Sequence, residues 1–270
     1  MIGLVLGETQ LGSLIVKKIK LLKIKFIIID ISKKKKFKNN KNSYSLSIGQ
    51  LGKAISLLKK NNCNKIIFAG RVNRPNFSKL KFDYKALYHL PQIIKASKKG
   101  DAYIIKIIVK IFQKEGIKII KQSYFNQELL LKKKIITKAK PDLISKRDIK
   151  IGKKIIHDLK TNNIGQATIV KNGNVIAIED KRGTDFMLNR ARKIMKNFRL
   201  KNKRQGILLK FPKTNQDLRI DLPTIGIKTI KKCFKLGLKG IVVKANQNIL
   251  LDRAKCVNFA DKKKMFILGV

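Results

Sequence analysis

Short apolar runs alternate with amphipathic segments along the first half of the chain. The runs that predict strands lie at residues 2–6, 24–31, 65–69 and 117–120. Between the first three runs, apolar residues recur at helical spacing, so the order is strand, helix, strand, helix, strand. This order favours a parallel sheet with right-handed crossovers. It predicts a Rossmann-like N-terminal α/β domain over residues 1–125, followed by a linker over 126–144.

The second half of the chain predicts a different arrangement of strands. Two apolar runs are joined by Asn172 and Gly173, and an Asn-Gly pair favours a tight hairpin turn. Before this hairpin, Ser145 and Asp148 form a capping-box pattern at the start of a helix. Further apolar runs, separated by helical patterns, lie at 206–210, 240–243, 248–251 and 265–268. We therefore expect a second α/β domain with a mixed sheet over residues 145–270.

Acidic residues are concentrated in one part of the chain. The protein has 16 Asp and Glu against 64 Lys and Arg. The acids that nevertheless lie within the single span from 179 to 226 are Glu179, Asp180, Asp185, Asp217 and Asp221. In so basic a chain, an acid cluster interleaved with Gly, Pro, Thr and Gln is a candidate functional site.

The segment that begins at Asp217 is expected to be extended. Side chains alternate faces in a strand, so Asp217, Arg219 and Asp221 would share one face. Two carboxylates can bind a divalent cation, and an arginine between them suits a phosphate. Thr224 is expected to be the N-cap of the following helix, whose N-terminus would favour an anion. The alternative is a set of edge-strand charges neutralised by nearby lysines, and the residues alone leave both interpretations open.

The charge of the whole chain has two explanations. The formal net charge is +48 and the pI is about 10.5. Such a charge is typical of proteins that bind nucleic acid or an anionic membrane. The lysines are spread along the chain, however, and arginine, which suits base recognition better, is scarce. We therefore attribute the excess mainly to compositional drift toward Lys, Ile and Asn, and keep a basic nucleic-acid-binding protein as the alternative function.

The turn after the first strand contains two glycines. Gly7 and Gly12 do not complete a G-x-G-x-x-G motif, although Asp30 lies where a ribose-binding acid would be expected. Nor does a lysine follow Gly12, as a P-loop would require. A nicotinamide-dependent oxidoreductase is therefore the less favoured alternative. After the third strand, Arg71 and Arg74 are either phosphate ligands or ordinary surface charges.

The spacing of the cysteines and the hydropathy of the chain indicate in which cellular compartment the protein resides. Cys63, Cys233 and Cys256 are widely spaced and form no C-x-x-C pair. This pattern suits a reducing cytosol and disfavours disulfides or a zinc site. No uncharged apolar run approaches the roughly 20 residues of a spanning helix, and no signal peptide is evident. We therefore expect a cytoplasmic protein.

Several motifs of this chain occur together in one known family. The longest are Q-D-L-R-I-D-L-P-T-I-G at 216–226 and G-T-D-F-M-L-x-R at 183–190. Shorter matches are R-V-N-R-P at 71–75, G-D at 100–101, I-G-Q-A at 164–167 and L-x-K-x-P-K at 208–213. On these motifs the chain resembles the LpxI-type UDP-2,3-diacylglucosamine pyrophosphatases of lipid A biosynthesis over nearly its full length.

The resemblance implies a two-domain hydrolase with its substrate between the domains. The reaction would be Mg²⁺-dependent hydrolysis of the diphosphate in UDP-2,3-diacylglucosamine, giving UMP and 2,3-diacylglucosamine 1-phosphate (lipid X). It also implies a cytoplasmic homodimer, with a peripheral position at the inner leaflet of the inner membrane. Nucleic acid is not an expected partner.

The same resemblance suggests roles for individual residues. Asp217 and Asp221 would bind the metal or activate water, with Asp221 the more important of the two. Asp185 and Glu179 are further candidate metal ligands. The candidates for contacts to the substrate phosphates are Arg219, Lys210, Lys213, Arg71, Arg74, Thr184 and Thr224. Other motif residues are Gly183, Gln216, Gly226, Gln166 and Asp101.

Overall fold

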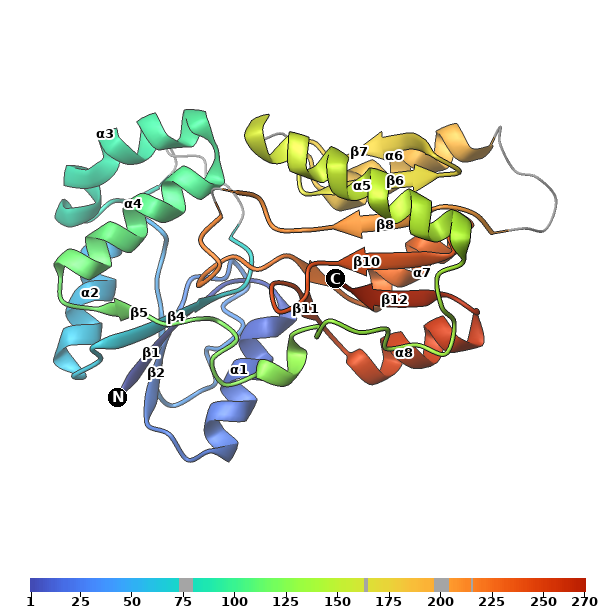
Figure 1. Cartoon of the computed structure of the whole chain (residues 1–270). Coiled ribbons are helices and arrows are strands. Elements are labelled where there is room, and N and C mark those ends of the chain that lie inside the picture. Colours follow the sequence, from blue (N-terminus) through green and yellow to red (C-terminus); the bar gives the residue numbers. More distant parts are fainter. Residues whose placement is uncertain (73–79, 163–164, 197–203, 215) are drawn as a thin grey trace. The chain divides into compact units, whose positions relative to one another are not determined.

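The chain forms two compact units (Figure 1). The structure is a computed structural model that describes residues 1–72, 80–162, 165–196, 204–214 and 216–270. Unit 1 consists of Met1–Gln127 and Asp217–Asp221, and unit 2 consists of Glu128–Gln216 and Leu222–Val270. The short segment Asp217–Asp221 therefore belongs to unit 1, although its neighbours on both sides along the chain belong to unit 2.

Unit 1 contains a five-stranded sheet in the order β3-β2-β1-β4-β5. The strands are β1 (Ile2–Leu6), β2 (Phe26–Asp30), β3 (Ser43–Ser45), β4 (Lys65–Ala69) and β5 (Lys118–Ile119). Every neighbouring pair is parallel. This is the strand order of a Rossmann sheet, so the prediction of a Rossmann-like N-terminal domain is confirmed.

Helices cover both faces of this sheet. They are α1 (Gln10–Leu21), α2 (Leu51–Lys60), α3 (Tyr84–Lys99) and α4 (Asp101–Lys114). Residues of α2, α3 and α4 share one buried core with the strands, and α1 packs on the opposite face (Figure 1). The sequence did not predict α3, because it contains Pro91 and several apolar residues on its exposed side, which obscure a helical period.

Unit 2 contains a mixed sheet in the order β12-β10-β8-β6-β7. Its strands are β6 (Ala167–Lys171), β7 (Asn174–Ile178), β8 (Ile207–Lys210), β10 (Gly240–Val243) and β12 (Phe266–Gly269). β8, β10 and β12 are parallel, whereas β6 runs antiparallel to both β7 and β8. A separate parallel pair consists of β9 (Thr224–Ile225) and β11 (Ile249–Leu250). The prediction of a second, mixed-sheet α/β domain is confirmed.

Helices also cover both faces of the unit 2 sheet (Figure 1). They are α5 (Leu143–Asn162), α6 (Thr184–Lys196), α7 (Ile227–Lys235) and α8 (Arg253–Lys262). Strand side chains alternate between the faces, so Leu208 joins the core beneath α6, α7 and α8, and Leu209 joins the core beneath α5. This burial on both sides explains why β8 and β10 are apolar runs. No helix in the part of the chain that the structure describes is long and apolar enough to cross a bilayer.

The segment expected to link the domains, 126–144, is divided differently in the structure. Its residues from Glu128 onward belong to unit 2. After a short 3-10 helix (η2, Gln127–Leu129), Leu131 is fully buried in the core of unit 2, and Ile135 pairs with Leu268 of β12. Apolar side chains therefore attach this connection to unit 2.

The start of α5 corrects the capping-box prediction. α5 begins at Leu143, and the carboxylate of Asp142 accepts a hydrogen bond from the Ser145 amide over 2.8 Å. Asp148 lies inside the helix, fully buried, and accepts hydrogen bonds from the Asn172 and Gly173 amides at 3.1 and 2.7 Å. These amides belong to the β6–β7 hairpin turn, which the sequence predicted correctly.

Candidate functional site

Polar residues of unit 2 gather at one edge of its sheet. β8 ends at Lys210, which lies opposite Ala167, the first residue of the antiparallel strand β6. Gln166 precedes β6, and Glu179 follows β7 at the same edge, where its amide donates to the Ala167 carbonyl over 2.8 Å. The register of the sheet therefore brings the backbones of Gln166, Glu179 and Lys210 close together.

Glu179 is a buried carboxylate with few protein partners. The residue is 3% exposed, and its Oε2 accepts a hydrogen bond from the Thr184 hydroxyl at 2.5 Å. The other buried acids are better satisfied, since Asp30 accepts three hydrogen bonds and Asp148 accepts two. Within the described part of the chain, Oε1 of Glu179 receives no hydrogen bond. This oxygen is therefore a candidate ligand for a metal ion or a base for water.

Lys210 supplies a positive charge at the same edge. It is 8% exposed, and its Nζ donates to the Thr224 carbonyl over 3.1 Å. Its own carbonyl accepts a hydrogen bond from Asn248 Nδ2 at 3.1 Å, which fixes the end of β8. Nearby, Oε1 of Gln166 is buried and has no hydrogen-bond partner among the described residues. We call Gln166, Glu179, Thr184 and Lys210 the Glu179 corner.

The remaining unit 2 candidates have local structural contacts. Asp185 is exposed and pairs with Lys232 over 2.6 Å. Gln216 Oε1 accepts a hydrogen bond from the Lys213 amide at 3.0 Å and closes a short turn. Gly183 precedes α6 with a φ of +89°, a conformation that favours glycine. These contacts order the segments that carry the motifs.

Thr224 is not the N-cap of a helix, so that prediction is wrong. Thr224 is the first residue of β9, where it pairs with Ile249. α7 begins at Ile227 and is preceded by Gly226 in an extended conformation. Thr and Ile are favourable strand residues, so the pairing of β9 with β11 places the helix start further along the chain.

The predicted strand at Asp217 is also wrong, because residues 217–221 form a turn in unit 1. The amides of Ile220 and Asp221 donate to the Asp217 carbonyl over 3.0 and 2.9 Å. The Asp217 carboxylate accepts a hydrogen bond from the Arg219 amide at 3.0 Å. Such a bond between an Asp side chain and the backbone two residues later stabilises a turn in competition with a strand. We call residues 217–221 the Asp217 turn.

Asp217 and Arg219 form an ion pair within this turn. Nε and Nη2 of Arg219 donate to the two carboxylate oxygens over 3.0 and 2.7 Å. The hydrogen-bonded Arg219 lowers the pKa of Asp217, and the charge of Lys106 acts in the same direction. Asp217 in turn raises the pKa of Arg219. A metal ion could bind Asp217 bidentately only by displacing this guanidinium.

Two contacts hold the Asp217 turn on unit 1. The Gln122 amide, which follows β5, donates to the Arg219 carbonyl over 2.8 Å. Ile220 packs against the buried core that includes Ile66 of β4 and Ile119 of β5. The turn therefore lies beyond the carboxyl ends of parallel strands, where α/β folds bind ligands.

The glycine after β1 allows close packing of two strand ends. The Glu8 amide donates to the Arg71 carbonyl over 3.0 Å, and a side chain at Gly7 would collide with that carbonyl. Asp30 is fully buried, and both its carboxylate oxygens accept hydrogen bonds from the loop after β2. It therefore has a structural role in place of the ribose contact of a dinucleotide site.

Three further candidates belong to the first half of the chain. Arg71 is exposed after β4, and Asp101 is the first residue of α4. Both belong to unit 1. Arg74 lies outside the described residues.

The candidate metal ligands of this chain are all carboxylates. The described residues contain no group of three or more His, Cys, Asp or Glu side chains that could hold a metal ion. Mg²⁺ commonly binds through one or two carboxylates, with waters and substrate phosphates completing its shell. The candidate ligands belong to both units, with Asp217 and Asp221 in unit 1 and Glu179 and Asp185 in unit 2.

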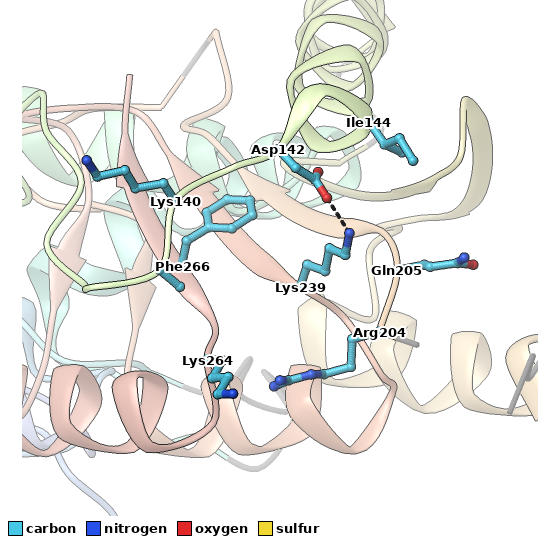
Figure 2. A pocket seen from close by; sticks show the side chains of 9 residues that line it. Lys140, Asp142, Ile144, Arg204, Gln205, Lys239, Lys264 and Phe266 are labelled. Atoms are coloured by element: carbon cyan, nitrogen blue, oxygen red, sulfur yellow. Dashed lines mark hydrogen bonds and ion pairs between the residues drawn. The ribbon is translucent and has the colours of Figure 1, made fainter. Parts of the chain in front are cut away.

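A cavity of about 670 Å³ lies at the other end of the unit 2 strands from the Glu179 corner (Figure 2). It is lined by residues at the amino ends of β8, β10 and β12, among them Arg204, Lys239 and Lys264. Asp142, at the start of α5, pairs with Lys239 in its wall. None of the sequence-derived candidates that the structure describes lines this cavity. It is therefore distinct from the Glu179 corner.

Comparison with known proteins covers both units. A family model described as the LpxI N-terminal domain matches residues 1–129, and one described as the LpxI C-terminal domain matches residues 132–268. A protein of Caulobacter vibrioides named UDP-2,3-diacylglucosamine pyrophosphatase LpxI is 35% identical over 226 residues. This match covers 83% of the present chain and 81% of the relative. The chain belongs to the LpxI family.

Proposed function

We propose that this protein is a UDP-2,3-diacylglucosamine pyrophosphatase. The observation that carries the proposal is its 35% identity over 226 residues with the Caulobacter vibrioides protein of that name. The products would be UMP and 2,3-diacylglucosamine 1-phosphate, lipid X. The proposed cofactor is Mg²⁺, and the proposed working form is a cytoplasmic homodimer at the inner leaflet of the membrane.

The Glu179 corner has the chemical groups that diphosphate hydrolysis needs. The reaction requires an oriented water and neutralisation of phosphate charge, part of which Mg²⁺ supplies when it is bound. The Thr184 hydroxyl holds Oε2 of Glu179, so Oε1 remains an acceptor for a water proton or a ligand for the metal. The Lys210 ammonium is fixed at the Thr224 carbonyl and carries the charge that suits a phosphate oxygen.

Other groups of the chain have chemistry that suits this substrate. The buried Oε1 of Gln166 would accept a hydrogen bond from a substrate hydroxyl or N–H group. Arg219 uses Nε and Nη2 for Asp217, and its guanidinium has further N–H donors for a phosphate. We assign Asp221 to metal binding or water activation, as the motif suggests.

The proposal is tested by measuring UMP release from UDP-2,3-diacylglucosamine, with Mg²⁺ and with a chelator. We expect metal-dependent release by the wild type. Neutralising one acid at a time, by Asp221→Asn or Glu179→Gln, is expected to reduce the rate at least about 100-fold. Asp158→Asn is the matched control, because Asp158 is an exposed acid on α5.

Each arm of this experiment can contradict one part of the proposal. Folded wild-type protein that releases no UMP would refute the function. Full release in the presence of the chelator would refute the Mg²⁺ requirement. Near-normal turnover of Asp221→Asn would remove Asp221 from the catalytic groups.

A further inference from the structure

α3 presents an apolar surface that no described residue covers. Three side chains of its first turns, Tyr84, Leu87 and Tyr88, are 86, 56 and 70% exposed. Pro91 is exposed on the same side one turn later, whereas Ala86 on the opposite side is buried in the core of unit 1. Several large apolar side chains exposed together on one helix face indicate an interaction surface.

The same face becomes basic toward the end of the helix. Lys95, Lys98 and Lys99 are exposed there, and α3 contains no acidic residue. At 3.6 residues per turn, Lys95 and Lys98 lie in line with the exposed apolar side chains of the first turns. The carboxylate of Asp83 caps the helix and accepts hydrogen bonds from the Ala86 and Lys53 amides. The face thus combines an apolar half and a cationic half.

We propose that this face of α3 docks on the surface of an anionic lipid bilayer. Helices with this combination lie in the headgroup region with their apolar side chains toward the acyl chains. Tyrosine suits this position, because its ring is apolar and its hydroxyl can stay in water. Lysines near the surface are attracted to anionic headgroups.

The charges on α3 favour a lipid surface over a second copy of the chain. Two copies that met through this face would bring together two basic surfaces, each with Lys95, Lys98 and Lys99 and with no acidic residue of α3. Such like-charge contacts disfavour association. An anionic bilayer presents the opposite charge and an apolar interior at the same time.

This inference deepens the proposed function and rests on it in one respect. A substrate with two acyl chains would reside in a membrane, so docking would bring the enzyme to its substrate. The docking itself requires no catalysis, and vesicle binding can therefore be measured separately from UMP release.

The test is sedimentation of the full-length protein with vesicles of phosphatidylcholine, with and without phosphatidylglycerol. We expect wild-type protein to prefer the vesicles that contain phosphatidylglycerol. The triple variant Tyr84→Ser, Leu87→Ser, Tyr88→Ser should bind them at least about tenfold more weakly. A second triple variant, Lys95→Gln, Lys98→Gln, Lys99→Gln, should lose most of the preference for phosphatidylglycerol.

The matched control changes exposed apolar residues of unit 2. Leu143 and Ile144 are 82 and 51% exposed, and the double variant Leu143→Ser, Ile144→Ser should bind vesicles as the wild type does. Since all these side chains are exposed, the thermal unfolding midpoint should change little in any variant. UMP release from detergent-dispersed substrate should also be unchanged.

Three results would overturn the docking proposal. The first is wild-type vesicle binding by the Tyr84, Leu87, Tyr88 variant, and the second is loss of binding in the unit 2 control alone. The third is loss of self-association in light scattering with vesicle binding intact, which would assign the face to a second copy. Vesicle binding without UMP release would instead refute the proposed function and leave the docking surface standing.

Discussion

The Asp217 turn and the Glu179 corner hold their carboxylates in different ways. Asp217 is paired with both ends of the Arg219 guanidinium, so the protein itself neutralises its charge. Glu179 is more deeply buried, and its partner is the neutral hydroxyl of Thr184. The buried acids Asp30 and Asp148 are also held by neutral donors, but they accept three and two hydrogen bonds, whereas Glu179 accepts one among the described residues. The charge of Glu179 therefore remains available to a ligand, whereas the charge of Asp217 is already compensated.

The strongest test of this difference between Glu179 and Asp217 is to neutralise each carboxylate in turn. Glu179→Gln keeps an oxygen that can accept from Thr184 but removes the charge, and we expect UMP release to fall about 1000-fold. Asp217→Asn should reduce release only about tenfold, because Arg219 has already neutralised this acid. The measurement is the steady-state rate with saturating Mg²⁺. Equal losses in the two variants would show that the hydrogen-bond partner does not decide which acid acts.

Asp148 provides a second way to examine acids held by neutral donors. Asp148→Ala would leave the amides of Asn172 and Gly173 without their acceptor. We expect the free energy of unfolding to fall by about 2 kcal/mol, with little change in UMP release per folded molecule. Urea unfolding measures the first quantity, and Asp158→Ala on the same helix is the exposed control. A large loss of turnover at unchanged stability would contradict a structural role for Asp148.

The contribution of the Asp217–Arg219 ion pair to stability can be tested through its dependence on pH. Arg219 lowers the pKa of Asp217, so the pair stabilises the fold above the unfolded-state pKa, and this contribution is lost as the pH falls through the lowered folded-state value. Arg219→Gln should raise the Asp217 pKa. Because Arg219 is partly exposed, we expect a loss of at most about 1 kcal/mol at pH 7, and a smaller difference from wild type at acid pH. An NMR titration in which the Asp217 pKa stayed unchanged in the variant would disprove this cause.

Glu115 should show the smallest effect. It pairs with Lys59 over 2.5 Å and with Lys85, and these contacts lower its pKa to about 2. Glu115→Gln should cost less than about 1 kcal/mol at neutral pH, and this cost should disappear as the pH falls from about 4 toward 2. UMP release should be unaffected. A clear loss of turnover in this variant would show that cation-held acids of unit 1 do more than stabilise it.

The strands could be predicted because a strand that is buried on both faces of its sheet is a continuous apolar run in the sequence. Every residue of β2 is buried, so Phe26–Asp30 is an apolar run that ends in an acid held by its own loop. The hairpin was equally easy to predict. Asn172 and Gly173 have φ of +50° and +83°, and few residue pairs adopt such a hairpin turn so readily. Local chemistry was decisive in both cases.

The Asp217 turn and the Glu179 corner were harder to predict from the sequence, each for a different reason. Alternating polarity predicts a strand at Asp217, but the bond from the Arg219 amide to the Asp217 carboxylate competes with that geometry. Alternation also says that Ile220 is buried without saying in which core. Glu179 was a candidate from its motif, yet its meeting with Gln166 and Lys210 depends on the register of β6, which no single segment encodes.

The placement of residues 217–221 in unit 1 has a consequence for how such a gene can be divided. The chain passes from one unit to the other after Gln127, after Gln216 and after Asp221. A fragment that ended at Gln127 would lack the Arg219 carbonyl that accepts from Gln122 and the Ile220 side chain that packs against its core. The halves are therefore poor modules for recombination, since a foreign second half would have to bring a turn that fits the first. A recombined chain would have to keep residues 217–221 matched to the N-terminal half on which they pack.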